Sequence, residues 1–183
     1  MLAQIATFLV DTVVAFFVAL LLARFHFQWL RVGFRNPVGA FVVATTNWLV
    51  LPARRVIPGL AGLDLATLLV AWLLQALGLW AIVAVAGGEP DVGGILAVAA
   101  VDLLRFSLYI LVFAVLMQVL FSWVNPHAPL APFFDAVTRP FLRPIQRLVP
   151  LVGGVDLSPA VLLIIVQVAL MLVWPLRAAV ASL

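Results

Sequence analysis

The sequence predicts an all-α integral membrane protein: four transmembrane helices, arranged as two parallel-related helix-loop-helix repeats with interfacial amphipathic loop helices. Three observations support this fold class. The 183-residue chain is 67% hydrophobic and only 9% charged, whereas charged residues alone make up about a quarter of a soluble domain. Four apolar stretches are long enough to cross a membrane. The second half of the chain repeats polar positions of the first half.

The four predicted spans follow from length. A spanning helix needs about 20 mostly apolar residues, because the hydrocarbon core is about 30 Å thick and a helix rises about 1.5 Å per residue. The spans are 5–27, 65–86, 95–124 and 157–176. A fifth apolar run, 38–51, is too short and is bounded by Pro37 and Pro52. We expect it to form an interfacial or shallow re-entrant helix.

The arginines predict the orientation. Seven of them lie in two loops: Arg31, Arg35, Arg54 and Arg55 after the first span, and Arg139, Arg143 and Arg147 after the third. The short connection 87–94 carries only Glu89 and Asp91. Basic loops stay in the cytoplasm, so we expect cytoplasmic basic loops with the N-terminus, the C-terminus and the acidic connection external. Arg177 is a single opposing charge. The N-terminus has no basic n-region, so the first span is expected to be retained.

An internal repeat appears when the chain is shifted by 92 residues. The shift aligns Phe41 with Phe133, Thr46 with Thr138, Pro52 with Pro144, Arg55 with Arg147, Pro58 with Pro150, Gly62 with Gly154, Asp64 with Asp156 and Gln75 with Gln167. Apolar coincidences are common in such a sequence, but matching prolines, arginine, aspartate and glutamine indicate a duplication. We place the repeats at 1–86 and 95–183, joined by the external connection 87–94. Each repeat contains two spans, so both should run in the same direction about a pseudo-two-fold axis along the membrane normal.

The second copy carries a recognisable motif. Asn125-Pro126 is followed by Thr-Arg-Pro-Phe-Leu-Arg-Pro-Ile-Gln-Arg-Leu-Val-Pro at 138–150 and by Gly-Gly-Val-Asp-Leu-Ser-Pro at 153–159. This pattern resembles the signature of the YggT family, small integral membrane proteins of bacteria and plastids that often have two copies of the repeat. The first copy departs from it, with Asn47, Trp48 and Leu51 at the positions of Arg139, Pro140 and Arg143.

The resemblance implies a multi-pass protein of the bacterial cytoplasmic (inner) membrane. Family members are linked to osmotic tolerance and cation balance, to haem attachment in a plastid cytochrome, and to division or nucleoid organisation. The resemblance therefore implies a non-enzymatic scaffold or accessory factor linked to osmotic or cation homeostasis or to the assembly of membrane complexes.

The second loop should lie on the membrane surface. Prolines disfavour helix interiors, so we expect a short helix over 133–138, a break, and a new turn near Pro144. We expect the apolar side chains to lie in the acyl boundary: Phe133, Phe134, Phe141, Leu142, Ile145 and Leu148. Arg139, Arg143 and Arg147 would then reach lipid phosphates. A tight turn at 153–154 would lead to a helix capped by Asp156 or Ser158.

Four loop arginines are candidate contacts for anionic lipids or a partner protein: Arg55, Arg139, Arg143 and Arg147. Arginine binds phosphate and carboxylate groups bidentately, which suits either ligand. The alternative is that these arginines act only as topology determinants lying on lipid headgroups.

Five polar residues within the spans are the remaining candidates: Asp11, Asp102, Arg105, Gln75 and Gln167. Asp102 and Arg105 could line an ion path, or they could neutralise each other at their i,i+3 spacing. Asp11 lies at a similar depth and could pair with Arg105. Gln75 and Gln167 occupy matching positions and could form a hydrogen bond across the pseudo-axis.

Catalysis and cofactor binding have little support in the sequence. The absence of cysteine excludes disulfides, thiolate metal sites and cysteine nucleophiles. His26 and His127 lack metal-ligand spacing, and no nucleophile-base pair or phosphate loop is visible. The few charges do not form the dense basic face that nucleic acid requires. We therefore expect no enzymatic activity. The expected partners are the lipid bilayer, a second copy of the chain or another membrane protein. The alternative function is a small oligomeric ion channel or transporter, which predicts aligned polar helix faces.

Overall fold

The computed structural model describes residues 1–59, 62–149 and 156–181, which form six α-helices. The helices are α1 (Leu2–Trp29), α2 (Pro37–Val56), α3 (Leu65–Val85), α4 (Val92–Val124), α5 (Ala131–Gln146) and α6 (Ser158–Ala181). Four of them, α1, α3, α4 and α6, are long and apolar enough to cross a membrane. They match the four predicted spans to within a few residues, which makes the chain a multi-pass membrane protein.

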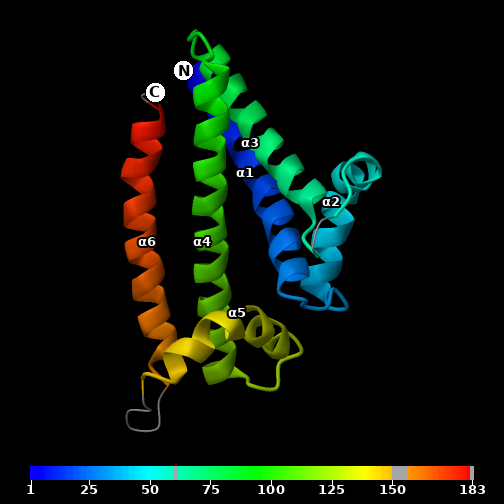
Figure 1. Cartoon of the computed structure of the whole chain (residues 1–183), viewed down its shortest axis with the longest axis vertical. Coiled ribbons are helices and arrows are strands. Elements are labelled where there is room, and N and C mark those ends of the chain that lie inside the picture. Colours follow the sequence, from blue (N-terminus) through cyan, green and yellow to red (C-terminus); the bar gives the residue numbers. More distant parts are fainter. Residues whose placement is uncertain (60–61, 150–155, 182–183) are drawn as a thin grey trace.

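The two halves of the chain run in the same direction (Figure 1). The chain descends α1, passes through α2, ascends α3 and turns at the upper end. It then descends α4, passes through α5 across the foot of α4, and ascends α6. Both termini lie at the same end as the α3–α4 connection. This confirms the predicted fold class of two parallel-related helix-loop-helix repeats.

The repeats are not related by a closed two-fold axis. Such an axis would match every contact between the copies with its reciprocal. α3 packs extensively against α4. The axis would require α6 to pack against α1 in the same way, but no such extensive contact occurs among the described residues. α6 packs instead on α4 and α5. The expectation of a pseudo-two-fold axis is therefore wrong, although the parallel direction is right.

Asx residues mark where helices begin. The Asn36 side chain accepts a hydrogen bond from the Gly39 backbone N–H at 2.8 Å, before α2. The Asp64 carboxylate accepts from Thr67 N–H at 3.3 Å, before α3, and Asp91 caps α4 in the same way. These bonds satisfy backbone donors that have no partner in the first helical turn.

Prolines do not interrupt the two loop helices, which corrects two expectations. α2 continues through Pro52 to Val56, past the boundary expected at residue 51. α5 is one helix over 131–146 with Pro140 and Pro144 inside it, without the break expected after residue 138. All three prolines are exposed. Each removes one backbone hydrogen bond on the outer side, while the opposite face stays packed on the spanning helices.

The buried face of α5 packs into the protein and joins the two copies. Phe133, Phe134 and Leu142 are buried, so the expectation that they lie in the acyl boundary is wrong. The Phe133 ring meets Phe27 of α1 edge-on, with 4.9 Å between ring centroids, and Val42 of α2 belongs to the same cluster. Aromatic packing therefore ties the second loop helix to the first repeat.

Candidate functional site

Asp102 of α4 is the centre of a charged cluster inside the spanning bundle and is 1% exposed. Arg177 of α6 donates from Nε to Oδ1 at 2.8 Å and from Nη2 to Oδ2 at 3.3 Å. Gln75 of α3 donates from Nε2 to Oδ2 at 3.0 Å. Arg105, one turn further along α4, places Nη2 3.4 Å from Oδ1. One carboxylate therefore links three spanning helices, and we call this group the Asp102 cluster.

The Asp102 cluster is not fully satisfied. Its two arginines and one aspartate give a formal charge of +1. In the part of the chain that the structure describes, the buried Oε1 of Gln75 and Nε of Arg105 have no hydrogen-bond partner. A buried polar atom without a partner is unfavourable. The cluster can therefore accept a further small polar group such as water.

A cavity of about 270 Å³ lies beside the cluster, towards the end of the bundle where the termini lie. It is lined by Glu89 and Asp91 of the connection, by Arg177, and by apolar residues of α3, α4 and α6. Farther along the bundle the fully buried side chains are both apolar, such as Val18 and Leu21, and polar, such as Thr46, Thr67 and Thr138. In the described residues, polar groups thus reach from one end to the Asp102 cluster, and no hydrogen bond links the cluster to the buried polar side chains farther along.

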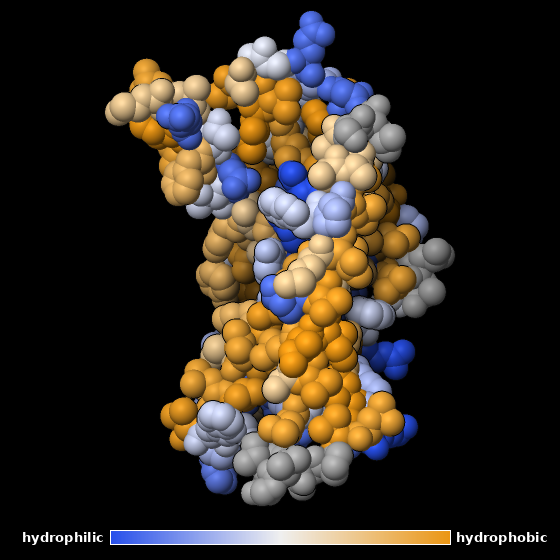
Figure 2. Space-filling view, turned by 90° about the vertical axis from the view of Figure 1, so that its left-hand side faces the viewer, coloured by the Kyte–Doolittle hydropathy of each residue, from blue (hydrophilic) through white to orange (hydrophobic). Residues whose placement is uncertain are grey.

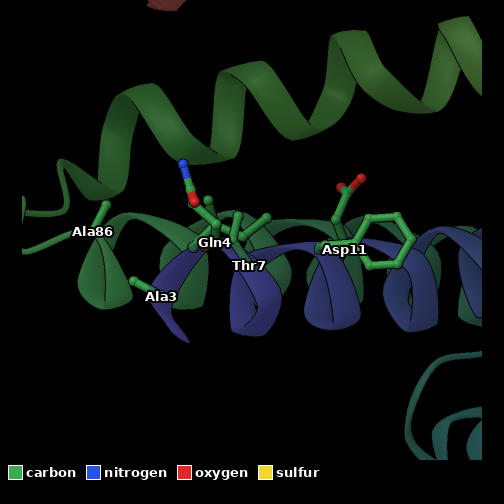
Figure 3. Close-up of a pocket in the computed structure, with 7 residues that line it drawn as sticks. Ala3, Gln4, Thr7, Asp11 and Ala86 are labelled. Atoms are coloured by element: carbon green, nitrogen blue, oxygen red, sulfur yellow. The ribbon is translucent and has the colours of Figure 1, made fainter. Parts of the chain in front are cut away.

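Asp11 lies away from the Asp102 cluster. It is exposed on α1 and has no ion pair among the described residues, so the expected pairing with Arg105 is wrong. Arg105 pairs with Asp102 because both lie on α4, one turn apart. Figure 3 shows Asp11 and Gln4 projecting from α1 on the side where α4 lies, with Thr7 between them along the helix. These residues line an open cavity of about 390 Å³ with the end of α3.

The matched glutamines have different environments. Gln75 is buried and donates to Asp102, as described above. Gln167 is exposed on α6 and has no hydrogen bond in the described part of the chain. The structure therefore does not bring Gln75 and Gln167 together across an axis, because the two repeats are not related by a closed two-fold axis.

A matching pair of polar clamps supports the repeat register. In the first copy, Arg54 of α2 donates from Nη2 to Asp64 at 2.5 Å. In the second copy, Gln146 of α5 donates to Asp156 at 2.9 Å. Residues 54 and 146 differ by 92, as do residues 64 and 156. Each clamp ties the end of the loop helix to the start of the following span. The partners expected for Pro58 and Gly62, at 150 and 154, and the turn at 153–154 lie outside the described residues.

Both clamp carboxylates are stabilised in the ionised form. Burial by itself would raise the pKa of Asp64, but hydrogen bonds from Arg54 and Thr67 hold this pKa below its ordinary value. At Asp156, desolvation would likewise raise the pKa, but hydrogen bonds from Ser158 and Gln146 outweigh it and lower the pKa of Asp156. Hydrogen bonds to a carboxylate favour its charged form.

The loop arginines form an exposed basic face. Arg55, Arg143 and Arg147 are exposed and have no ion pair in the described residues, while Arg139 pairs with Asp135 one turn away on α5. The opposite face of α5 is buried against α4 and α6. α5 is thus an amphipathic helix fixed on the bundle, with cationic groups directed outwards.

Two buried contacts were not predicted from the sequence. The sequence indicates Arg177 only as a single opposing charge, whereas the structure makes it the closest partner of Asp102. Arg24 of α1 is 4% exposed and donates to Thr46 at 2.8 Å and to Asn47 at 3.0 Å, both on α2. A signal was present for Arg24, because an ionisable group within a span needs a polar partner. Arg177 lies one residue beyond the predicted span 157–176, so this signal did not extend to it. No group of three or more potential metal-ligating residues occurs among the described residues.

Comparisons with known proteins agree with the repeat architecture. The CCB3/YggT family profile matches residues 3–85 and 97–177, one segment in each repeat. The chain is 35% identical over 164 residues to the uncharacterized protein YggT of Escherichia coli (strain K12), covering 88% of this chain and 85% of that protein. It is 34% identical over 160 residues to the uncharacterized protein PA0392 of Pseudomonas aeruginosa, covering 84% and 80%. A protein of Vibrio alginolyticus is 31% identical over 166 residues, covering 89% and 90%. No solved structure matches. The chain belongs to the CCB3/YggT family.

Proposed function

We propose that this protein is a non-enzymatic membrane scaffold or accessory factor whose loop helices form a basic platform for anionic lipids or a membrane-protein partner. The observation that carries the proposal is the construction of α5. Its apolar side is buried in the bundle, while Arg143 and Arg147 are exposed and unpaired in the described residues. A helix whose only role was to cover the membrane surface would not need a face packed into the protein.

We assign the end of α2 to the platform by the repeat register. Arg55 and Arg147 share the 92-residue register, and both lie directly after a clamp residue, Arg54 or Gln146. The clamps hold the ends of α2 and α5 against the following spans. Fixed guanidinium groups lose less conformational freedom on binding a phosphate or carboxylate than mobile ones.

The arginine distribution supports an inner-membrane orientation with this platform in the cytoplasm and both termini external. A cytoplasmic basic surface would meet the anionic leaflet, where each arginine contributes about 1 kcal/mol to lipid attraction. A role in osmotic or cation homeostasis, or in assembly of membrane complexes, would then operate through recruitment to this surface.

The test is a pair of matched double variants. Arg55→Gln/Arg147→Gln should insert normally, because five loop arginines remain, but should retain about 30-fold less anionic phospholipid by native mass spectrometry in mild detergent, from about 1 kcal/mol per arginine. The control, Arg31→Gln/Arg35→Gln, removes the same charge outside the clamped ends and should keep the lipid. A partner pull-down from native membranes uses the same variants. Equal retention by both variants would show that the arginines are only topology signals.

The second candidate is a small oligomeric ion channel or transporter, which the Asp102 cluster and its adjoining cavity favour. In the described residues no hydrogen bond continues from the cluster to the buried polar side chains farther along the bundle, so transport would require several copies. Ion flux into liposomes that contain the purified protein, and its loss in Asp102→Asn, would support this function over the scaffold.

A further inference from the structure

α6 has an outer face with regular heptad spacing. Seven residues recur at alternating intervals of four and three: Ala160, Ile164, Gln167, Met171, Trp174, Ala178 and Ala181. All seven are exposed. Figure 2 views the molecule from the side on which α6 lies and shows a largely apolar surface with scattered hydrophilic residues. We call these seven residues the α6 seam.

The spacing of the α6 seam is the pattern by which two helices pack along their length. Apolar residues repeating every 3.5 positions on average form a straight seam when helices cross at a small left-handed angle, as in coiled coils and most transmembrane pairs. Alanines at both ends of the seam permit close approach of the backbones. Within the chain, α6 uses a different face, including Leu162, Val166 and Val173, to pack on α4 and α5.

Gln167 gives the α6 seam a polar centre. It is the tenth residue of α6, about 14 Å from the helix start at a rise of about 1.5 Å per residue, and therefore lies well inside the span. Its amide has no hydrogen bond in the described residues, whereas Gln75, its match in the repeat register, is buried and bonded. Lipid offers no hydrogen-bond partner at this depth.

We propose that two copies of this chain associate through the α6 seam, with the Gln167 side chains hydrogen-bonded to each other. All copies share one orientation in the membrane, so the pair is parallel and its two-fold axis lies along the membrane normal. Such an axis brings each seam position opposite itself. A glutamine amide both donates and accepts, which makes the central position self-complementary. A single polar residue in a seam also fixes the register of the two helices.

This inference goes beyond the proposed function, because a basic platform for lipid or partner can operate as a monomer. It also differs from the contact between the repeats, where Gln75 donates to a charged residue on a different helix. The second copy supplies the partner that Gln167 lacks among the residues that the structure describes.

Cysteine cross-linking tests the seam directly, since the chain has no cysteine of its own. Single variants Ile164→Cys and Met171→Cys should form disulfide-linked dimers in native membranes, because seam positions approach within the distance a disulfide requires. The matched controls Ile165→Cys and Leu172→Cys are also exposed but lie about 100° further around the helix than Ile164 and Met171, and they should not cross-link. Equal cross-linking on both faces, or none on either, would overturn the proposal, as would cross-linking of Ile164→Cys only to a different protein.

The role of Gln167 is tested in the purified protein. Gln167→Leu should weaken dimerisation about 5- to 30-fold in a dilution series in mild detergent, which is the effect of about 1–2 kcal/mol seen for interhelical amide hydrogen bonds. Gln167→Asn should restore part of the loss. The position is exposed, so an unchanged unfolding transition of the monomer confirms that the fold is intact. Undiminished dimerisation of Gln167→Leu would refute the hydrogen bond.

Discussion

Replacing Asp102 by asparagine should destabilise the bundle more than replacing either of its arginine partners. In the wild type, one buried carboxylate faces Arg177 at 2.8 Å and Arg105 at 3.4 Å. Asp102→Asn removes the negative charge and leaves two guanidinium groups without a counter-ion. Breaking a buried pair in this way costs about 3–5 kcal/mol. Arg177→Gln leaves the neutral pair of Asp102 and Arg105, and its cost should be about 1.5–3 kcal/mol, the value of a hydrogen bond to a charged group.

The two substitutions should not be additive. Once Asp102 is neutral, removing Arg177 also removes an uncompensated charge. The double variant Asp102→Asn/Arg177→Gln should therefore be more stable than the sum of the single effects by about 0.5–3 kcal/mol, the range of coupling for residues in contact.

The measurement is an unfolding titration with sodium dodecyl sulfate in mixed micelles, followed by the fluorescence of the six tryptophans. Asp11→Asn is the matched control, since Asp11 is an exposed carboxylate on α1 without an ion pair in the described residues, and its effect should stay within about 0.5 kcal/mol. The reasoning fails if Asp102→Asn costs no more than this control, or if the double variant equals the sum of the singles.

Three further predictions concern topology, the clamps and packing. Reporter fusions after Gly88 should read as external and fusions near Ala128 as cytoplasmic, and the opposite pattern would reverse the orientation. Asp64→Ala should cost more stability than Asp156→Ala, by about 1 kcal/mol, because Asp64 loses a helix cap and an ion pair, whereas Asp156 loses only hydrogen bonds from the uncharged donors Gln146 and Ser158. Both clamp pKa values are lowered, so their stabilisation is present at neutral pH and should be lost as the pH falls below about 4 in an acid titration; constant stability there would contradict the clamps. Gly78→Ala should weaken α1–α3 packing by about 1–3 kcal/mol in the same detergent titration, since a Cβ there would come within 2.8 Å of a valine of α1, and no change would show that the helices separate freely.

Elements defined by local pattern were predictable from the sequence. The four spans follow from the length of uninterrupted apolar residues, which depends only on the thickness of the membrane. The duplication and its parallel direction follow from the register of polar residues such as Asp64 and Asp156, and the structure repeats that register in its two clamps. The caps of α2 and α3 follow from Asn36 and Asp64 standing directly before an apolar run.

Contacts between distant segments were decided only by the tertiary structure. Arg177 lies 75 residues from Asp102, and no spacing rule connects residues on different helices. From the prolines alone, the sequence predicted that α2 would end before Pro52 and that α5 would be broken. Both predictions were wrong, because the effect of proline on an isolated helix does not include the packing of the opposite helix face. The two glutamines looked equivalent because they occupy the same register, yet Gln75 found a partner on α4 and Gln167 found none in the described chain. The repeat register can be read from the sequence, but the hydrogen-bond partner of each glutamine depends on how the helices are arranged. The sequence does not determine that arrangement, because in a bilayer every apolar helix face is equally compatible with lipid.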